Sequence, residues 1–83
     1  MKLKPTFQDY TEAEFTELVA KIFSAEGGEK YQNVLLENFI TVSEHPKSSD
    51  LIYYNYDEDL TPEKVVAEVR EWRKSQELPD FKT

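Results

Sequence analysis

The chain has 83 residues and no cysteine, so it is long enough for one small domain that neither a disulfide nor a thiolate metal site stabilises. With 39% hydrophobic residues, the composition is typical of a globular rather than a disordered protein. No apolar run approaches the ~20 residues of a membrane-spanning helix, and the first ten residues lack the apolar stretch of a secretory signal. We therefore expect a single cytoplasmic domain spanning residues 1–83.

The chain is acidic, with 17 acidic and 10 basic residues and a net charge of −7. This charge disfavours direct binding to nucleic acid, because phosphates would repel it. It suits a basic protein partner, since opposite potentials accelerate encounter. A negative charge also keeps a small domain soluble, so the charge alone does not identify a binding protein.

The first helix is predicted to begin at residue 11. Residues 1–10 have no helical periodicity, and we expect them to be irregular, with Phe7 and Tyr10 at an edge of the domain. Thr11 and Glu14 then have the spacing of a capping box, in which each side chain bonds the backbone N–H of the other residue. The apolar residues that follow recur three and four positions apart, as on one helical face: Phe15, Leu18, Val19 and Ile22.

Two glycines and a proline delimit the second predicted helix. We expect Gly27 and Gly28 to end the first helix, because glycine adopts the left-handed cap conformation without strain. The second helix is predicted over residues 29–43 and ends before Pro46. Its apolar residues cover more of the circumference than a single core contact requires: Tyr31, Leu35, Leu36, Phe39, Ile40 and Val42.

Acidic residues and three tyrosines are interleaved over residues 47–61. Ser48 or Ser49 is predicted to cap a short third helix that includes Tyr53 and Tyr54. A one-turn helix cannot bury two adjacent side chains on one face, so we expect at least one of these rings to be exposed. Exposed tyrosines are frequent at binding hot spots, whereas core burial is an equally common role for aromatic residues.

The last helix is predicted to begin at Thr61 and Pro62, an N-cap followed by a proline at the first helical position, and to end near Ser75 or Gln76. Its expected buried face consists of Val65, Val66, Val69 and Trp72. Three basic residues are expected to interact with the negative end of its dipole: Arg70, Arg73 and Lys74. Four helices joined by short loops predict a small, distorted helical bundle.

Signatures of enzymes and metal sites are absent from the sequence. It has no glycine-rich phosphate loop, nucleophile elbow or zinc-protease motif. His45 is the only histidine, and a structural or capping role near a helix end explains it better than catalysis. Residues 57–59 are acidic but lack the glycine and the ligand spacing of a calcium loop. We therefore expect a protein without enzymatic activity, cofactor or metal.

Five separated segments, in the same order and spacing along essentially the whole chain, resemble the colicin and pyocin DNase immunity family. They are DYTEAEF (9–15), EHP (44–46), SDLIYY (49–54), EWR (71–73) and PDFK (79–82). The resemblance implies an all-α fold, a small distorted antiparallel four-helix bundle with a short third helix. It also implies a partner, the His-Asn-His-type DNase domain of a cognate bacteriocin. That domain would be bound at an exosite beside its active site, so that DNA is excluded.

The same resemblance implies which residues make the interface. The short third helix supplies shared binding energy, through Ser49, Asp50, Tyr53 and Tyr54. The second helix supplies selectivity between toxins, through Glu29, Gln32, Asn33, Leu36, Glu37 and Ile40. Asn55 departs from the family pattern, which usually has proline there. The residues alone leave an alternative open, in which the chain is an acidic helical adaptor that binds another basic protein.

Overall fold

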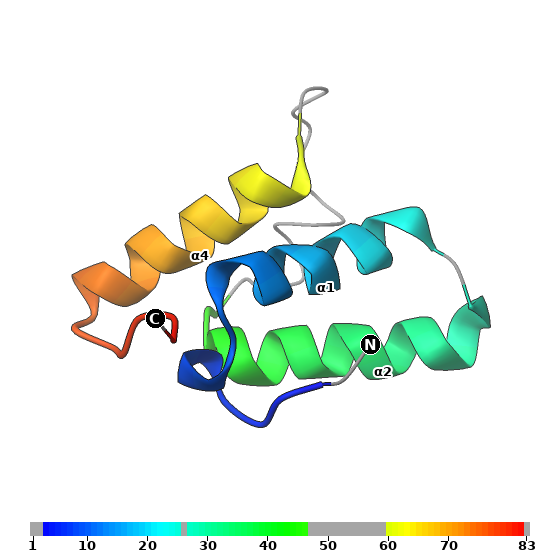
Figure 1. Ribbon diagram of the computed structural model, residues 1–83, viewed down its shortest axis with the longest axis horizontal. Helices are drawn as coiled ribbons and strands as arrows, with labels where there is room; N and C mark the ends of the chain where they lie inside the picture. The colour runs from blue at the N-terminus through cyan, green and yellow to red at the C-terminus, as the bar shows by residue number, and fades with distance from the viewer. Residues whose placement is uncertain (1–2, 26, 47–59, 83) are drawn as a thin grey trace.

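The computed structural model describes residues 3–25, 27–46 and 60–82, and the regular secondary structure in these ranges is entirely helical. A single 3-10 turn, η1 (Phe7–Asp9), precedes the helices α1 (Glu12–Ser24), α2 (Gly28–Ser43) and α4 (Pro62–Ser75). Both α2 and α4 run opposite to α1 (Figure 1). The all-α prediction is confirmed. The predicted short third helix lies outside the described residues, so the number of helices stays a prediction.

Helix α1 is the central element of the described fold. It packs against α2 on one side and α4 on the other, whereas α2 and α4 make little direct contact along their backbones (Figure 1). The predicted capping box is present at its start, where Thr11 Oγ1 accepts from the Glu14 amide at 3.1 Å. Glu14 Oε1 accepts from the Thr11 amide at 2.9 Å. The apolar face that was predicted for α1 is buried.

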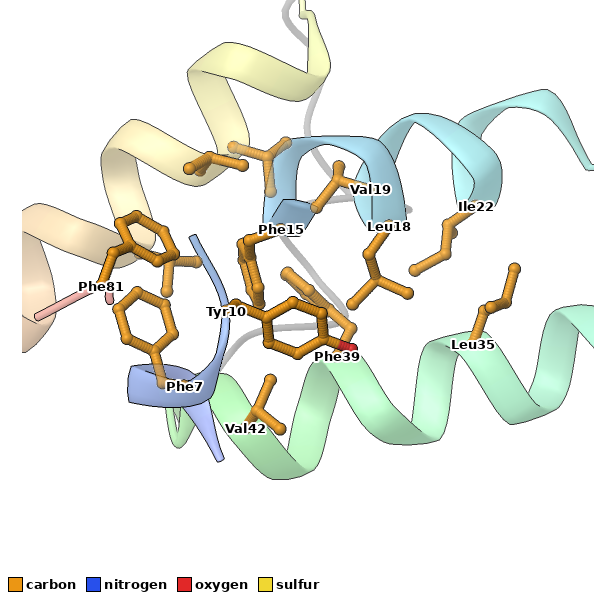
Figure 2. Close-up of a cluster of buried hydrophobic side chains, with 13 residues drawn as sticks. Phe7, Tyr10, Phe15, Leu18, Val19, Ile22, Leu35, Phe39, Val42 and Phe81 are labelled. Atoms are coloured by element: carbon orange, nitrogen blue, oxygen red, sulfur yellow. The ribbon is translucent and has the colours of Figure 1, made fainter. Parts of the chain in front are cut away.

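The N-terminal segment contributes directly to the core, which corrects the expectation of an edge position. Phe7 and Tyr10 are both fully buried. Phe7 stacks on Phe81 with ring centroids 4.2 Å apart, and Tyr10 meets Phe15 edge-on at 5.5 Å (Figure 2). A 3-10 turn followed by an extended residue has no helical repeat, so periodicity could not reveal this burial. The core comprises Phe7, Tyr10, Phe15, Leu18, Val19, Ile22, Leu35, Phe39, Val42, Val65, Val66, Val69 and Phe81.

The turn between α1 and α2 differs from the prediction. The left-handed residue after Ser24 is Ala25, with φ +56°, and not a glycine. Gly27 and Gly28, with φ of +85° and +83°, instead begin α2. A Cβ atom on Gly27 would overlap the ring of Tyr31, so this residue must be glycine for the ring to lie against the turn. Tyr31 is nevertheless 38% exposed and does not belong to the core.

Helix α4 begins and ends where the sequence predicts. Thr61 Oγ1 accepts from the Lys64 amide at 3.2 Å, and Ser75 is the last helical residue. The buried face differs in one member, because Arg73 is buried while Trp72 is only partly buried. The indole of Trp72 lies against the ring of His45, with centroids 4.9 Å apart. This contact gives His45 a packing partner on α4.

Arg73 was predicted to interact with the dipole at the end of its own helix, α4, but its side chain bonds mainly to other parts of the chain. Its guanidinium lies 4.1 Å from the ring centroid of Phe7. Nη1 donates to the carbonyls of Val42 and Ser43, both at 3.2 Å, and so caps the end of α2. Nε and Nη2 donate to the carbonyl of Pro79 at 3.2 and 3.1 Å. A buried charge needs such partners, and here one side chain joins four parts of the chain.

The C-terminal residues fold back onto α1 and α4. Arg70 donates two hydrogen bonds to the carboxylate of Asp80, at 3.0 and 2.9 Å, and one to Glu12 at 2.9 Å. The Lys82 amide donates to the carbonyl of Tyr10 at 2.9 Å. These bonds place Phe81 beside η1, where it closes the core. No helix within the described ranges has the length and apolar character to span a membrane.

Candidate protein-binding surface

The six residues predicted to confer selectivity lie on one side of α2. Their spacing of three and four positions places them along the same strip of the helix, next to the buried residues Leu35 and Phe39. We call this strip the α2 face. Most of it is exposed, and two members are partly buried at its border with the core. It comprises Glu29, Gln32, Asn33, Leu36, Glu37 and Ile40.

The centre of the α2 face is apolar and its neighbours are acidic. Leu36 packs against the edge of the core, and Ile40, one turn further, is 40% exposed. Glu29 and Glu37 are exposed and make no ion pair with any residue that the structure describes. An apolar patch beside unpaired carboxylates suits a partner with an apolar contact and basic side chains.

The two amides of the α2 face are in different environments. Gln32 is partly buried, and its Nε2 donates to the carbonyl of Lys21 in the last turns of α1, at 3.1 Å. This side chain therefore helps to hold the α1–α2 pair together. Asn33 is exposed. Of the two polar residues that the sequence indicates, Asn33 is the one whose amide faces solvent.

The opposite flank of α2 is covered by the N-terminal segment. The hydroxyl of Tyr10 donates to Asn38 Oδ1 at 2.6 Å and accepts from the Lys4 amide at 3.1 Å. Asn38 Nδ2 donates to the carbonyl of Lys4 at 2.8 Å, which closes the network. Burial raises the pKa of the Tyr10 hydroxyl, so it remains a neutral donor. The N-terminal segment does not cover the α2 face, whose residues remain accessible at the surface.

One exposed apolar residue of α2 was not identified from the sequence. Val34 is 48% exposed, more than Ile40, and lies away from the α2 face. Val34 does not align with the predicted core residues Leu35 and Phe39 or with Leu36 and Ile40, and this position could have indicated its exposure. Four further predicted contact residues lie outside the described residues and stay predictions: Ser49, Asp50, Tyr53 and Tyr54.

Potential metal ligands are not clustered in the described residues, and the two charged groups of a hollow beside η1 are paired. No group of three or more potential metal ligands occurs among the residues that the structure describes. A hollow of about 340 Å³ lies between η1, the end of α2 and the C-terminal residues. Its two charged groups, Arg73 and Glu44, pair with each other at 3.3 Å (Nη1 to Oε2).

Comparison with known proteins identifies close relatives of the whole chain. Residues 7–75 match the sequence profile of the family described as colicin immunity protein / pyocin immunity protein. The chain is 41% identical to the pyocin-S1 immunity protein of Pseudomonas aeruginosa over 86 aligned residues. It is equally similar to the pyocin-S2 immunity protein of P. aeruginosa strain PAO1. Each alignment covers 96% of this chain and 98% of the relative.

Two solved structures have nearly the same fold. A chain in the crystal structure of the pyocin AP41 DNase–immunity complex has a TM-score of 0.87 and 37% identity, covering 100% of this chain and 97% of that one. A chain in the structure of the mutant nuclease domain of pyocin S8 with its cognate immunity protein has a TM-score of 0.86 and 34% identity. That match covers 96% of this chain and 100% of the other. The chain belongs to the colicin and pyocin immunity protein family.

Proposed function

We propose that this chain is the immunity protein of a nuclease bacteriocin, which binds the DNase domain of the cognate toxin and prevents it from cleaving DNA in the producing cell. The observation that carries this proposal is the similarity, over the full chain, to a chain of the pyocin AP41 DNase–immunity complex. The exposed α2 face and the net charge of −7 support it independently. A DNase domain must be basic to hold phosphates, so the two charges are complementary.

The proposed mechanism is exclusion of DNA by binding beside the active site. Two surfaces make the contact, the α2 face and the segment that carries Tyr53 and Tyr54. Large aromatic side chains are frequent hot spots, so these tyrosines supply binding energy to any toxin of the class. The bound acidic domain then repels the DNA backbone and occupies the space that it needs. The chain performs no chemistry and requires no cofactor in this mechanism.

Selectivity between toxins follows from how well the toxin's surface complements the apolar and polar side chains of the α2 face. Burial of Leu36 and Ile40 against an apolar residue of the partner adds binding free energy, at about 25 cal/mol per Å² of apolar surface buried. A non-cognate toxin that leaves the amide of Asn33 buried without a hydrogen bond loses about 1–3 kcal/mol. Gln32 contributes less to this discrimination, because its Nε2 already bonds to α1.

A binding panel tests the proposal. Catalytically inactive nuclease domains of pyocins AP41 and S8 are titrated with the purified protein by calorimetry. Cytochrome c, a basic protein without nuclease activity, is the control for unspecific charge attraction. We expect a one-to-one complex with at least one nuclease domain and none with cytochrome c. Binding to cytochrome c alone would favour the acidic adaptor over the immunity protein.

A further inference from the structure

The C-terminal end of α2 is stabilised by contacts with another helix, because α2 itself supplies few hydrogen-bond partners for its last turn. Glu44 ends the helix in the left-handed conformation, with φ +59°, where glycine is the usual residue. Its amide makes only a long bond, 3.4 Å, to the carbonyl of Ile40. The last carbonyls of a helix need partners from elsewhere. In this protein they find them on α4, a helix that α2 hardly contacts.

Arg73 is the residue that supplies these partners. Its Nη1 lies within 3.3 Å of the carbonyls of Val42 and Ser43 and of the carboxylate of Glu44. The guanidinium is only 3% exposed and is itself fixed, since its other nitrogens bond to Pro79 and its plane lies over an aromatic ring. A planar fork with five donors can hold several acceptors at once, which lysine cannot do.

This contact lies at the C-terminal end of the α2 face. Ile40, at the end of the α2 face, is in the helical turn that Arg73 caps. The chain leaves α2 through Pro46, and Ser49 follows three residues later in the sequence. We propose that Arg73 is a positioning residue for nuclease binding: it fixes the end of α2, and with it the last turn of the α2 face, which carries Ile40. The proposal rests on the proposed function.

Arg70 provides the matched control. It also projects from α4 and also holds the C-terminal residues, through its two bonds to Asp80. Among its contacts in the described structure, none involves α2. If attachment of the C-terminal residues were what binding requires, replacing either arginine would have the same effect. If the end of α2 is what matters, only the replacement of Arg73 affects binding.

The test compares Arg73→Lys and Arg70→Lys with the wild-type chain, against whichever nuclease domain of the panel binds the wild type most tightly. Stopped-flow kinetics are recorded where denaturation curves show each variant to be folded. We expect Arg73→Lys to raise the dissociation rate about tenfold, equivalent to about 1.4 kcal/mol, with unchanged association because the charge is kept. Arg70→Lys should stay within about twofold of wild type in both rates. Wild-type dissociation for Arg73→Lys, or equal losses in both variants, would overturn the proposal.

A measurement on the wild type decides the question even if Arg73→Lys does not fold. If the arrangement held by Arg73 favours nuclease binding, then binding must in turn stabilise that arrangement. Hydrogen exchange of the Arg73 Nε–H and of the Glu44 amide should therefore slow in the complex, while the Lys82 amide serves as the reference. Unchanged exchange at both sites in a formed complex would refute the positioning role. Absence of any complex would instead refute the proposed function, and the inference with it.

Discussion

Replacing Ile40 by alanine is expected to weaken nuclease binding while leaving the protein folded. The change removes about three methyl or methylene groups, each worth about 0.8 kcal/mol when fully buried. Because 40% of Ile40 is exposed in the free protein, that fraction is what a partner can still bury. The expected loss is therefore about 1 kcal/mol, or about a fivefold increase in Kd.

The matched control for this prediction is Val34→Ala. Val34 is on the same helix and is more exposed than Ile40, at 48%, but it lies away from the α2 face. Calorimetric titration of both variants with the nuclease domain should give a higher Kd for Ile40→Ala and a wild-type Kd for Val34→Ala. Chemical denaturation should show both variants folded, with losses of about 1.4 kcal/mol for Ile40→Ala and about 0.8 kcal/mol for Val34→Ala from the buried fraction of each side chain. Equal Kd values for Ile40→Ala and wild type would refute the reasoning.

Four further predictions concern the charge, the second contact segment, the first turn and the pH dependence. The association rate, measured by stopped flow, should fall at least about tenfold from low to physiological salt, because opposite charges steer the encounter; a flat dependence would contradict steering. Tyr53→Ala and Tyr54→Ala should each cost at least about 2 kcal/mol of binding by calorimetry, and wild-type affinity in both would exclude a shared hot spot. Gly27→Ala should lower the free energy of unfolding by about 1–3 kcal/mol in urea titrations. Gly28→Ala should cost less, because it shares the positive φ but has open space at its Cβ position. The hydrogen bonds that the Arg70 side chain donates to Asp80 lower the pKa of the Asp80 carboxyl. The ionised carboxylate therefore contributes to stability at pH values above its ordinary pKa, and this contribution is lost as the pH falls through the lowered pKa. Urea titrations at acidic pH should show this loss, and a pH-independent contribution would contradict it.

The parts of the fold that depend on local signals were predictable from the sequence. The capping box at Thr11 and Glu14 and the Thr61–Pro62 start of α4 are formed by residues a few positions apart, and both are confirmed. Such contacts need no knowledge of the rest of the chain. Their success indicates that the starts of α1 and α4 are specified locally, whereas the glycine signal misplaced the end of α1.

The parts that depend on distant contacts were not predictable. Phe7 and Tyr10 are buried because the C-terminal residues and α1 cover them, which no short-range pattern encodes. Arg73 is a basic residue near a helix end, a position that ordinarily faces solvent. Only the proximity of the end of α2, from residues about thirty positions earlier, makes it a buried cap.

The α2 face could be predicted in outline but not in detail. Helical spacing places its residues on one side of α2, and the family membership implied by the sequence is confirmed. The hydrogen bond that ties Gln32 to α1 depends on the packing of two helices, so the sequence could not separate it from the solvent-facing Asn33. Contact of the α2 face with a nuclease remains a prediction.

A titration of DNA cleavage tests the central claim most directly. The active form of whichever nuclease domain binds the chain most tightly is mixed with increasing amounts of the purified protein, and plasmid cleavage is followed on a gel. The account predicts that cleavage falls in proportion to the added protein and stops at one equivalent. Undiminished cleavage in the presence of several equivalents of the folded chain would contradict it.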